Sequence, residues 1–203
     1  MTRLYCNTCE KPLKTCLCSF IKKINNLNDV LIFQHVSEKK HALGTAKILD
    51  LSLKNCSLHT GEDFEEHFLN DVLFLDNKKN YLLFPTDEAV SIDSLPLEER
   101  SKMRLIAVDG TWRKSKLLLH KNPILKNLPS VKLNPGKTSR YTIRKQPFSE
   151  ALSTLEAVYE TLSFLEKDDE KFLPLIEAFD KMIENQIQKI PKEIFQKNYK
   201  KNK

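Results

Sequence analysis

Long apolar runs, internal repeats and low-complexity segments are all missing from this chain of 203 residues. No run approaches the roughly 20 apolar residues that a membrane-spanning helix needs, which argues against an integral membrane protein. The sequence reaches Cys6 before any apolar stretch forms, so we expect no secretory signal and a cytoplasmic location. Glycine is scarce, with four residues, and tryptophan occurs once. The length favours one domain, or one domain with a small appendage.

Charge is present in both signs, with a modest basic excess. Lys and Arg total 33 against 27 Asp and Glu, which gives a formal net charge of +6. The basic residues concentrate in 1–60 and 112–147, whereas 150–180 is balanced or acidic. Such an excess permits an anionic partner such as nucleic acid but does not require one.

Four of the five cysteines lie close together near the start of the chain: Cys6, Cys9, Cys16 and Cys18. The Cys-x-x-Cys half has zinc-knuckle spacing, and four thiolates suit a tetrahedral, structural zinc ion. An iron–sulfur cluster also takes four cysteines and is left open. Two disulfides are disfavoured in a reducing compartment, and a redox Cys-x-x-Cys pair would need a thioredoxin-like pattern that does not follow. Cys56 stands alone, which predicts a small buried apolar residue.

The main body alternates between strand-like and helix-like patterns. Strands are predicted at 30–33, 72–75, 81–84, 104–108 and 131–133, helices at 47–53, 112–121, 149–165 and 172–188, and a loop or turn at 94–100. This alternation predicts an α/β fold with a mainly parallel sheet.

The most informative motif is Asp109-Gly110-Thr111-Trp112, which follows the buried strand 104–108. Open α/β sheets bind ligands at the carboxyl ends of their strands, so a carboxylate here predicts a ligand site. The alternative is a simple strand-to-helix turn, with Asp109 as a helix cap and Trp112 as a core anchor.

A second polar segment lies between a strand and a helix. Gln34 and His35 follow the strand 30–33, and Gly44-Thr45 precede the next helix, an arrangement that offers backbone amides to an anion.

The helix 149–165 has two candidate caps, Ser149 and Ser153. Glu156, a charged residue on this helix, is expected to face solvent.

The segment 132–147 carries several basic side chains and no carboxylate. Its basic residues beyond Lys132 are Lys137, Arg140, Arg144 and Lys145. A solvated basic loop is one interpretation. A phosphate-binding surface is the other, because Arg and Lys contacts to phosphates supply most of the affinity for nucleic acids.

Taken together, these blocks resemble the DTW-domain family, which is named for its Asp-Thr-Trp signature. The blocks are Gln34-His35 with Glu38 and Gly44-Thr45, then Asp109-Gly110-Thr111-Trp112, then Arg144-Lys145-Gln146-Pro147 with Leu152-Ser153-Thr154-Leu155-Glu156-Ala157, together with the cysteine cluster. The resemblance is strongest to the bacterial tRNA-uridine aminocarboxypropyltransferases and covers nearly the whole chain.

The resemblance implies an α/β fold related to the knotted SPOUT methyltransferases, and whether this chain is knotted is left open. We expect three parts: a four-cysteine zinc-binding segment at 1–24, a DTW catalytic domain at 25–190 and a basic tail at 191–203. The oligomeric state is also left open.

The resemblance further implies an enzyme that transfers the 3-amino-3-carboxypropyl group of S-adenosylmethionine to ring nitrogen 3 of a uridine in tRNA. The by-product would be methylthioadenosine. The alternatives are an S-adenosylmethionine-dependent RNA methyltransferase and a non-catalytic, zinc-containing module that binds RNA.

Each candidate residue receives a role on this basis. The expected catalytic residues are Asp109, the first candidate for a general base, and Glu156. The expected residues around S-adenosylmethionine are Gln34, His35, Gly44, Thr45, Asp109, Gly110, Thr111, Trp112, Ser153 and Thr154. The expected RNA contacts are Arg113, Lys114, Lys137, Arg140, Arg144 and Lys145, and the expected Zn²⁺ ligands are Cys6, Cys9, Cys16 and Cys18.

Overall fold

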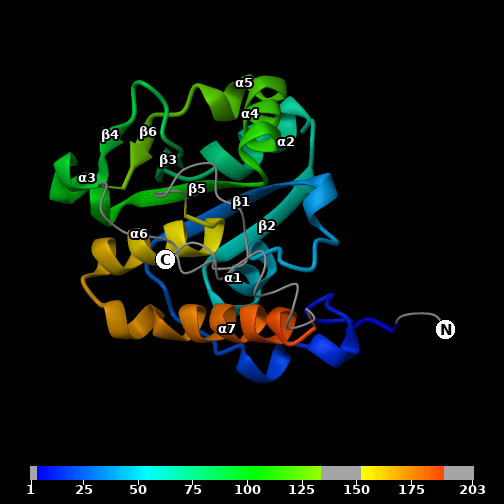
Figure 1. Cartoon of the computed structure of the whole chain (residues 1–203). Helices are drawn as coiled ribbons and strands as arrows, with labels where there is room; N and C mark the ends of the chain where they lie inside the picture. The colour runs from blue at the N-terminus through cyan, green and yellow to red at the C-terminus, as the bar shows by residue number, and fades with distance from the viewer. Residues whose placement is uncertain (1–3, 134–151, 190–203) are drawn as a thin grey trace.

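The computed structural model describes residues 4–133 and 152–189. Within them the chain forms a six-stranded, all-parallel sheet in the order β2-β1-β5-β3-β6-β4, with helices on both faces (Figure 1). The strands are β1 (Asp29–His35), β2 (Cys56–Gly61), β3 (Lys79–Leu83), β4 (Val90–Ser91), β5 (Met103–Asp109) and β6 (Ser130–Lys132). The predicted α/β fold with a parallel sheet is therefore confirmed.

Short and long helices connect these strands. The α-helices are α1 (Ala46–Ser52), α2 (Glu66–Phe74), α3 (Leu97–Ser101), α4 (Trp112–Lys121), α5 (Pro123–Lys126), α6 (Thr154–Glu166) and α7 (Asp169–Ile187). The 3₁₀ turns are η1 (Leu13–Thr15), η2 (Cys18–Phe20), η3 (Val36–Glu38) and η4 (Ile92–Ser94).

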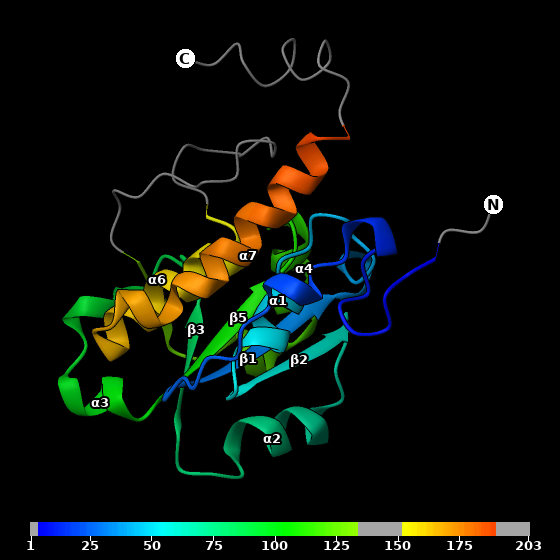
Figure 2. The same cartoon turned by 90° about the horizontal axis from the view of Figure 1, so that it is seen from below.

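Strand β5 lies inside the sheet and is buried along its whole length. Because successive side chains of a strand point to opposite faces, Leu105 and Ala107 join one core while Ile106 and Val108 join the other. Helices α1, α6 and α7 cover the first face, as Figure 2 shows from below, and α2, α4 and α5 cover the second. A strand buried on both faces explains the continuous apolar run at 104–108.

The segment before β1 packs against the first face of the sheet. Leu17 is buried in the core beside α7, and η2 contacts that helix. Ile24 then forms an isolated parallel bridge with Leu53, the residue that ends α1. The N-terminal cysteine segment is therefore held against the sheet domain by apolar burial and backbone hydrogen bonds.

Most predicted elements are present. Strands occur at the predicted 30–33, 81–84, 104–108 and 131–133, and helices at the predicted 47–53, 112–121 and 172–188, with ends shifted by a few residues. Helix α6 begins at Thr154 rather than at Ser149, which lies outside the described residues.

The strand predicted at 72–75 is wrong, because this apolar run is the end of helix α2 and the cap that follows it. Leu69 and Leu73, four residues apart, are buried on one face of the helix, whereas Phe74 and Leu75 are exposed. The loop predicted at 94–100 is also partly wrong. Helix α3 begins after Pro96, with Glu98 and Glu99 in its first turn, where carboxylates are favourable.

Strand β2 was not predicted. It is an edge strand whose residues are all half-buried, and its polar Ser57, His59 and Thr60 hide the pattern that marks an inner strand. Cys56 begins this strand and is partly rather than fully buried against the core. Burial raises the pKa of its thiol, as suits a structural cysteine.

Across the described residues, no helix has both the length and the apolar character needed to span a bilayer. The question of a knot stays open, as it was from the sequence, since the chain between β6 and α6 includes 134–151, outside the described residues.

Candidate functional site

The site is built around Asp109, the last residue of β5, which is only 5% exposed. Gln34 donates a hydrogen bond from Nε2 to one carboxylate oxygen of Asp109 at 2.8 Å. Thr154 donates from Oγ1 to the other carboxylate oxygen at 2.7 Å. Three segments that the sequence marked separately therefore meet at the carboxyl edge of the sheet.

The parallel register extends this contact into a row. Gln34 lies opposite Thr60 on β2 and opposite Asp109 on β5. Thr60 donates from Oγ1 to Oε1 of Gln34 at 3.3 Å. The polar row Thr60–Gln34–Asp109–Thr154 thus crosses β2, β1, β5 and the start of α6. Sequence reasoning missed Thr60, although the run Leu58–Thr60 closed by Gly61 was a signal for a strand end.

Both oxygens of Asp109 accept hydrogen bonds, and an ionised carboxylate is a pure acceptor. The arrangement therefore suits a fixed negative charge at the strand end. Asp109 does not cap α4, as the structural alternative for this motif required. Thr111 is the cap, since its Oγ1 accepts from the backbone N–H of Lys114 at 3.4 Å. Gly110 allows the tight turn before the helix, because a Cβ there would lie 3.2 Å from the Cβ of Lys114.

Trp112 is partly buried and contacts Phe84, whose ring centroid lies 5.3 Å away at an interplanar angle of 53°. Phe84 directly follows β3, so this aromatic pair also lies at the carboxyl edge. Trp112 is therefore a partly exposed ring beside Asp109 rather than a core anchor. Arg113, the next residue, is exposed on α4.

Ser153 and Glu156 form the start of α6. Ser153 Oγ accepts from the backbone N–H of Glu156 at 3.3 Å, and the Glu156 carboxylate accepts from the backbone N–H of Ser153 at 2.8 Å. This reciprocal capping box confirms Ser153 as the cap. The expectation that Glu156 faces solvent is wrong, because the cap draws its side chain inward and leaves the residue 4% exposed. The same cap places Thr154 against Asp109.

His35 and Glu38 lie just beyond β1. His35 is buried, and its Nδ1 accepts from the backbone N–H of Ser37 at 3.2 Å. Glu38 is also buried and forms an ion pair with Lys114 of α4 at 2.7 Å. Lys114, an expected RNA contact, thus joins the segment after β1 to the helix after Asp109.

Gly44 and Thr45 precede α1, and Thr45 is buried without a side-chain cap bond. Lys11 donates to the Gly44 carbonyl at 3.1 Å. Burial lowers the pKa of Lys11, although the nearby charges of Cys9, Asp109 and Glu10 oppose that shift. Sequence reasoning missed Lys11, because a lysine is ordinarily a surface residue.

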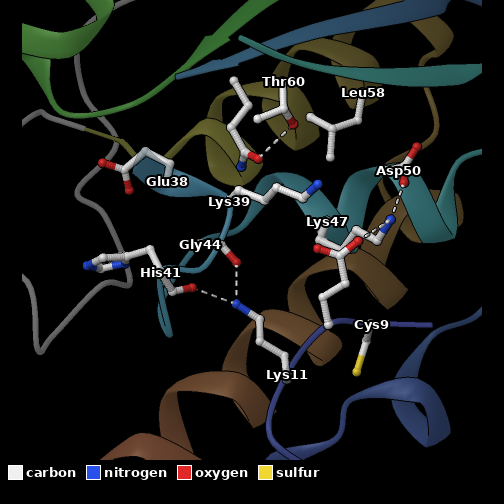
Figure 3. A pocket seen from close by; sticks show the side chains of 12 residues that line it. Cys9, Lys11, Glu38, Lys39, His41, Gly44, Lys47, Asp50, Leu58 and Thr60 are labelled. Atoms are coloured by element: carbon white, nitrogen blue, oxygen red, sulfur yellow. Dashed lines mark hydrogen bonds and ion pairs between the residues drawn. The ribbon is translucent and has the colours of Figure 1, made fainter. Parts of the chain in front are cut away.

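A polar pocket opens between the cysteine segment and the row (Figure 3). Gln34 of β1 is one of its lining residues. Leu58 and Thr60 line it from β2, and Lys39 reaches into it from the segment after η3. Lys47, on α1, is already paired with Asp50 at 3.1 Å. The pocket therefore offers side chains of both charge signs next to Gln34, the residue that donates to Asp109.

The four N-terminal cysteines converge as predicted. Their Sγ atoms all lie within 4.8 Å of one another, with 3.6 Å between Cys6 and Cys18 and 3.7 Å between Cys9 and Cys16. Zinc bonds sulfur at about 2.3 Å, so tetrahedral thiolates lie about 3.8 Å apart, and a single ion fits this cluster. A cluster of several irons would spread its thiolates farther apart.

Two of the four thiols differ in how readily they ionise. Hydrogen bonds from the backbone N–H groups of Cys9 and Thr8 lower the pKa of Cys6 to about 6. Burial, together with hydrogen bonds to Cys6 and Cys16, raises the pKa of Cys18 to about 12. Four such thiols ionise together only when a metal ion balances their charge.

Among the residues expected around S-adenosylmethionine, Gln34, Asp109 and Thr154 meet directly. Gly110, Thr111, Trp112 and Ser153 adjoin them in the chain, whereas His35, Gly44 and Thr45 lie on the segments beside the row. Four expected RNA contacts, Lys137, Arg140, Arg144 and Lys145, lie outside the described residues.

The chain is thus an α/β protein with a parallel sheet covered on both faces, and its buried carboxylate lies at the edge where proteins of this class bind their ligands. Residues 3–187 match the DTW domain, so the chain belongs to the DTW-domain family.

Three curated relatives extend the comparison. The chain is 34% identical over 175 residues to "tRNA-uridine aminocarboxypropyltransferase 2" of Drosophila melanogaster, which covers 81% of this chain and 68% of the relative. It is 31% identical over 170 residues to the protein of the same name from Macaca fascicularis, covering 81% and 57%. It is 26% identical over 198 residues to "tRNA-uridine aminocarboxypropyltransferase A" of Arabidopsis thaliana, covering 83% and 75%. The chain thus spans between about half and three quarters of these relatives. No solved structure matches it.

Proposed function

We propose that this protein is an aminocarboxypropyltransferase that modifies uridine in tRNA. The donor is S-adenosylmethionine, the acceptor is ring nitrogen 3 of the base, and the by-product is methylthioadenosine. The names of the relatives support the reaction class. The observation that carries the proposal is that Gln34 and Thr154 both donate to the buried carboxylate of Asp109, although the three residues come from three separate blocks of the family pattern.

The reaction exchanges one bond for another. The bond between the sulfonium sulfur and the first carbon of the aminocarboxypropyl arm breaks, and a bond from uridine N3 to that carbon forms. The sulfur keeps the electron pair and leaves in methylthioadenosine, while the N3 proton passes to a base or to water. All three carbons on the sulfur are activated, so selectivity depends on which of them the site aligns with the base.

Asp109 suits the task of alignment. Two donors hold its carboxylate in place, so it offers a fixed negative charge to the amino group of the donor's arm. This fits the geometry better than the role of general base, in which the carboxylate would have to take up a proton against those two bonds. Lys39 and the pocket beside Gln34 offer a complementary positive charge for the arm's carboxylate.

Glu156 is proposed as an orienting residue, since its carboxylate caps α6 and thereby positions Thr154. Trp112 is proposed as a stacking surface for uracil or adenine, an interaction worth about 1–3 kcal/mol per base in nucleic-acid complexes. His35, Gly44 and Thr45 complete the surroundings of the donor. Arg113, Lys114 and the basic residues at 137–145 are proposed contacts to tRNA phosphates.

The cysteine cluster is proposed to hold one structural Zn²⁺. All four positions around the ion would be filled by thiolates, so no position is left for substrate. The metal would therefore stabilise the N-terminal segment and take no part in the transfer. A cytoplasmic location is proposed as well, because tRNA and reduced thiols occur together there.

The decisive experiment incubates purified protein with S-adenosylmethionine and tRNA that lacks the modification. Mass spectrometry then identifies both the nucleosides and the small by-product. We expect aminocarboxypropyl-uridine together with methylthioadenosine. A methylated nucleoside with S-adenosylhomocysteine would instead identify a methyltransferase, and tRNA binding without either product would identify a non-catalytic RNA-binding module.

A further inference from the structure

Lys11 connects the cysteine segment to the segment after η3, although it is neither a candidate metal ligand nor a residue with a role in the proposed transfer. The residue is 8% exposed, and its ammonium donates to the carbonyls of His41 and Ala42 at 3.0 Å each and of Gly44 at 3.1 Å. Figure 3 shows the side chain rising from the cysteine segment to this stretch of chain. We call residues 39–45, between η3 and α1, the site loop.

The three contacts use all the hydrogen-bonding capacity of the ammonium. A lysine has three donors and no acceptor, and a buried charge without partners is costly. Three carbonyls that point at one atom can do so only if the site loop curls around it. Two backbone bonds fix the same curl, from His41 N–H to the Glu38 carbonyl at 2.9 Å and from Gly44 N–H to the His41 carbonyl at 3.0 Å.

The position of Lys11 is set in turn by a metal-ligand candidate. The backbone N–H of Cys6 donates to the Lys11 carbonyl at 2.8 Å, and the N–H of Glu10 donates to the Cys6 carbonyl at 2.9 Å. Glu10 has a φ of 56°, a left-handed conformation that a non-glycine residue adopts only when its surroundings hold it there. The turn that aims Lys11 is therefore part of the cysteine cluster.

The other side of the site loop meets the reactive edge of the sheet. Glu38, immediately before the loop, pairs with Lys114 on the helix that follows Asp109. Lys39, the first residue of the loop, lines the pocket together with Gln34. Lys39, His41 and Gly44 of this loop line the pocket, so the shape of the loop contributes to the shape of the pocket.

We propose that the cysteine segment positions the site loop through Lys11, which makes Lys11 a positioning residue for the donor pocket. Occupancy of the cysteine cluster by a metal fixes the turn at Glu10, the turn fixes the Lys11 ammonium, and the ammonium fixes the loop. The effect on donor binding rests on the proposed function, whereas the effect on the loop does not.

The test compares Lys11→Met with Lys22→Met by hydrogen exchange and mass spectrometry on the full, metal-loaded chain. Lys22 is a matched control, since it is an exposed lysine of the same segment that pairs only at the surface with Glu177, at 2.8 Å. In Lys11→Met we expect the amides of His41 and Gly44 to exchange about tenfold faster or more, because bonds from a charged donor are lost. Metal content and the exchange of β5 stay unchanged. Lys22→Met behaves as wild type.

A chelator supplies the second arm and needs no variant to fold. Removing the metal from the wild type should speed exchange in the site loop to the level of Lys11→Met, and removing it from Lys11→Met should add little there. The affinity for S-adenosylmethionine, measured by calorimetry, should fall about tenfold or more in both cases. Loop exchange that stays at the wild-type rate in Lys11→Met, or chelator and mutation effects that simply add, would overturn the proposal. A wild type that binds no S-adenosylmethionine would instead overturn the proposed function and leave the loop measurement valid.

Discussion

Asp109 draws its properties from neighbours that are distant in sequence. Gln34 precedes it by 75 residues and Thr154 follows it by 45, yet both donate to its carboxylate. A carboxylate held on both oxygens keeps its orientation before any substrate arrives. Such preorganisation is the main way in which proteins stabilise charge in a reaction.

Replacing Asp109 tests this role. In Asp109→Asn the new amide NH₂ faces one of the two donors, which leaves that donor unpaired and costs about 1–3 kcal/mol of stability. Because the charge is also lost, we expect the rate of uridine modification to fall about 100-fold or more. Thr154→Val is the control, since it removes one donor and keeps the charge, and we expect less than about a tenfold loss of rate. Unchanged activity in Asp109→Asn would contradict the role.

Glu156 offers a separate test, since a glutamine can serve in the same capping box. We expect Glu156→Gln to keep its free energy of unfolding within about 0.5 kcal/mol. Glu156→Ala should lose about 1 kcal/mol, the usual cost of a lost cap. If Glu156 only orients α6, the rate of transfer in Glu156→Gln stays within about tenfold of wild type. A much larger loss in a fully folded Glu156→Gln protein would show that its carboxylate acts in the reaction itself.

At the level of elements, predictability followed burial. Strand β5, buried on both faces, and helix α7, with a full apolar stripe, stand out in the sequence because their patterns repeat over many residues. Strand β2 and helix α2 do not, since β2 is a polar edge strand and the last residues of α2 mimic a strand. Pairings such as Thr154 with Asp109, and the burial of Lys11, depend on tertiary contacts that no local pattern contains.

The N-terminal cysteine segment is predicted to bind a metal ion that stabilises the fold. We expect one zinc ion per chain, measured by elemental mass spectrometry of the purified protein. Cys16→Ser should lose the metal and unfold at a lower temperature, because metal affinity of this kind contributes to the folding free energy. Cys56→Ser is the matched control and should keep the full metal content, since Cys56 lies in β2, outside the cluster. Iron in place of zinc, or a metal-free wild type, would contradict the proposed ion.

At the scale of the whole molecule, the net charge of +6 and the exposed Arg113 beside the site bear on tRNA binding. We expect the dissociation constant for tRNA to rise about tenfold or more between roughly 50 and 200 mM salt, because phosphate contacts release counterions. Arg113→Ala should reduce the slope of log Kd against log salt by about 1. Lys102→Ala should leave the slope unchanged, since Lys102 is exposed at the opposite edge of the sheet, just before β5. If Arg113→Ala has the same slope as the wild type, Arg113 makes no contact with a tRNA phosphate, and the RNA binds at another surface.

The pairing of β1 with β5 also affects when the sheet and its site can form during synthesis of the chain. Parallel strands so far apart in the chain meet late, because closing a long loop costs entropy before the contact forms. Until β5 has left the ribosome, the inner edge of β1 has no neighbour, and an open strand edge invites aggregation. Thr154 reaches Asp109 later still, when α6 docks. Substrate recognition is therefore among the last properties that the nascent chain acquires, and a chain stalled after β5 would have a sheet but an incomplete site.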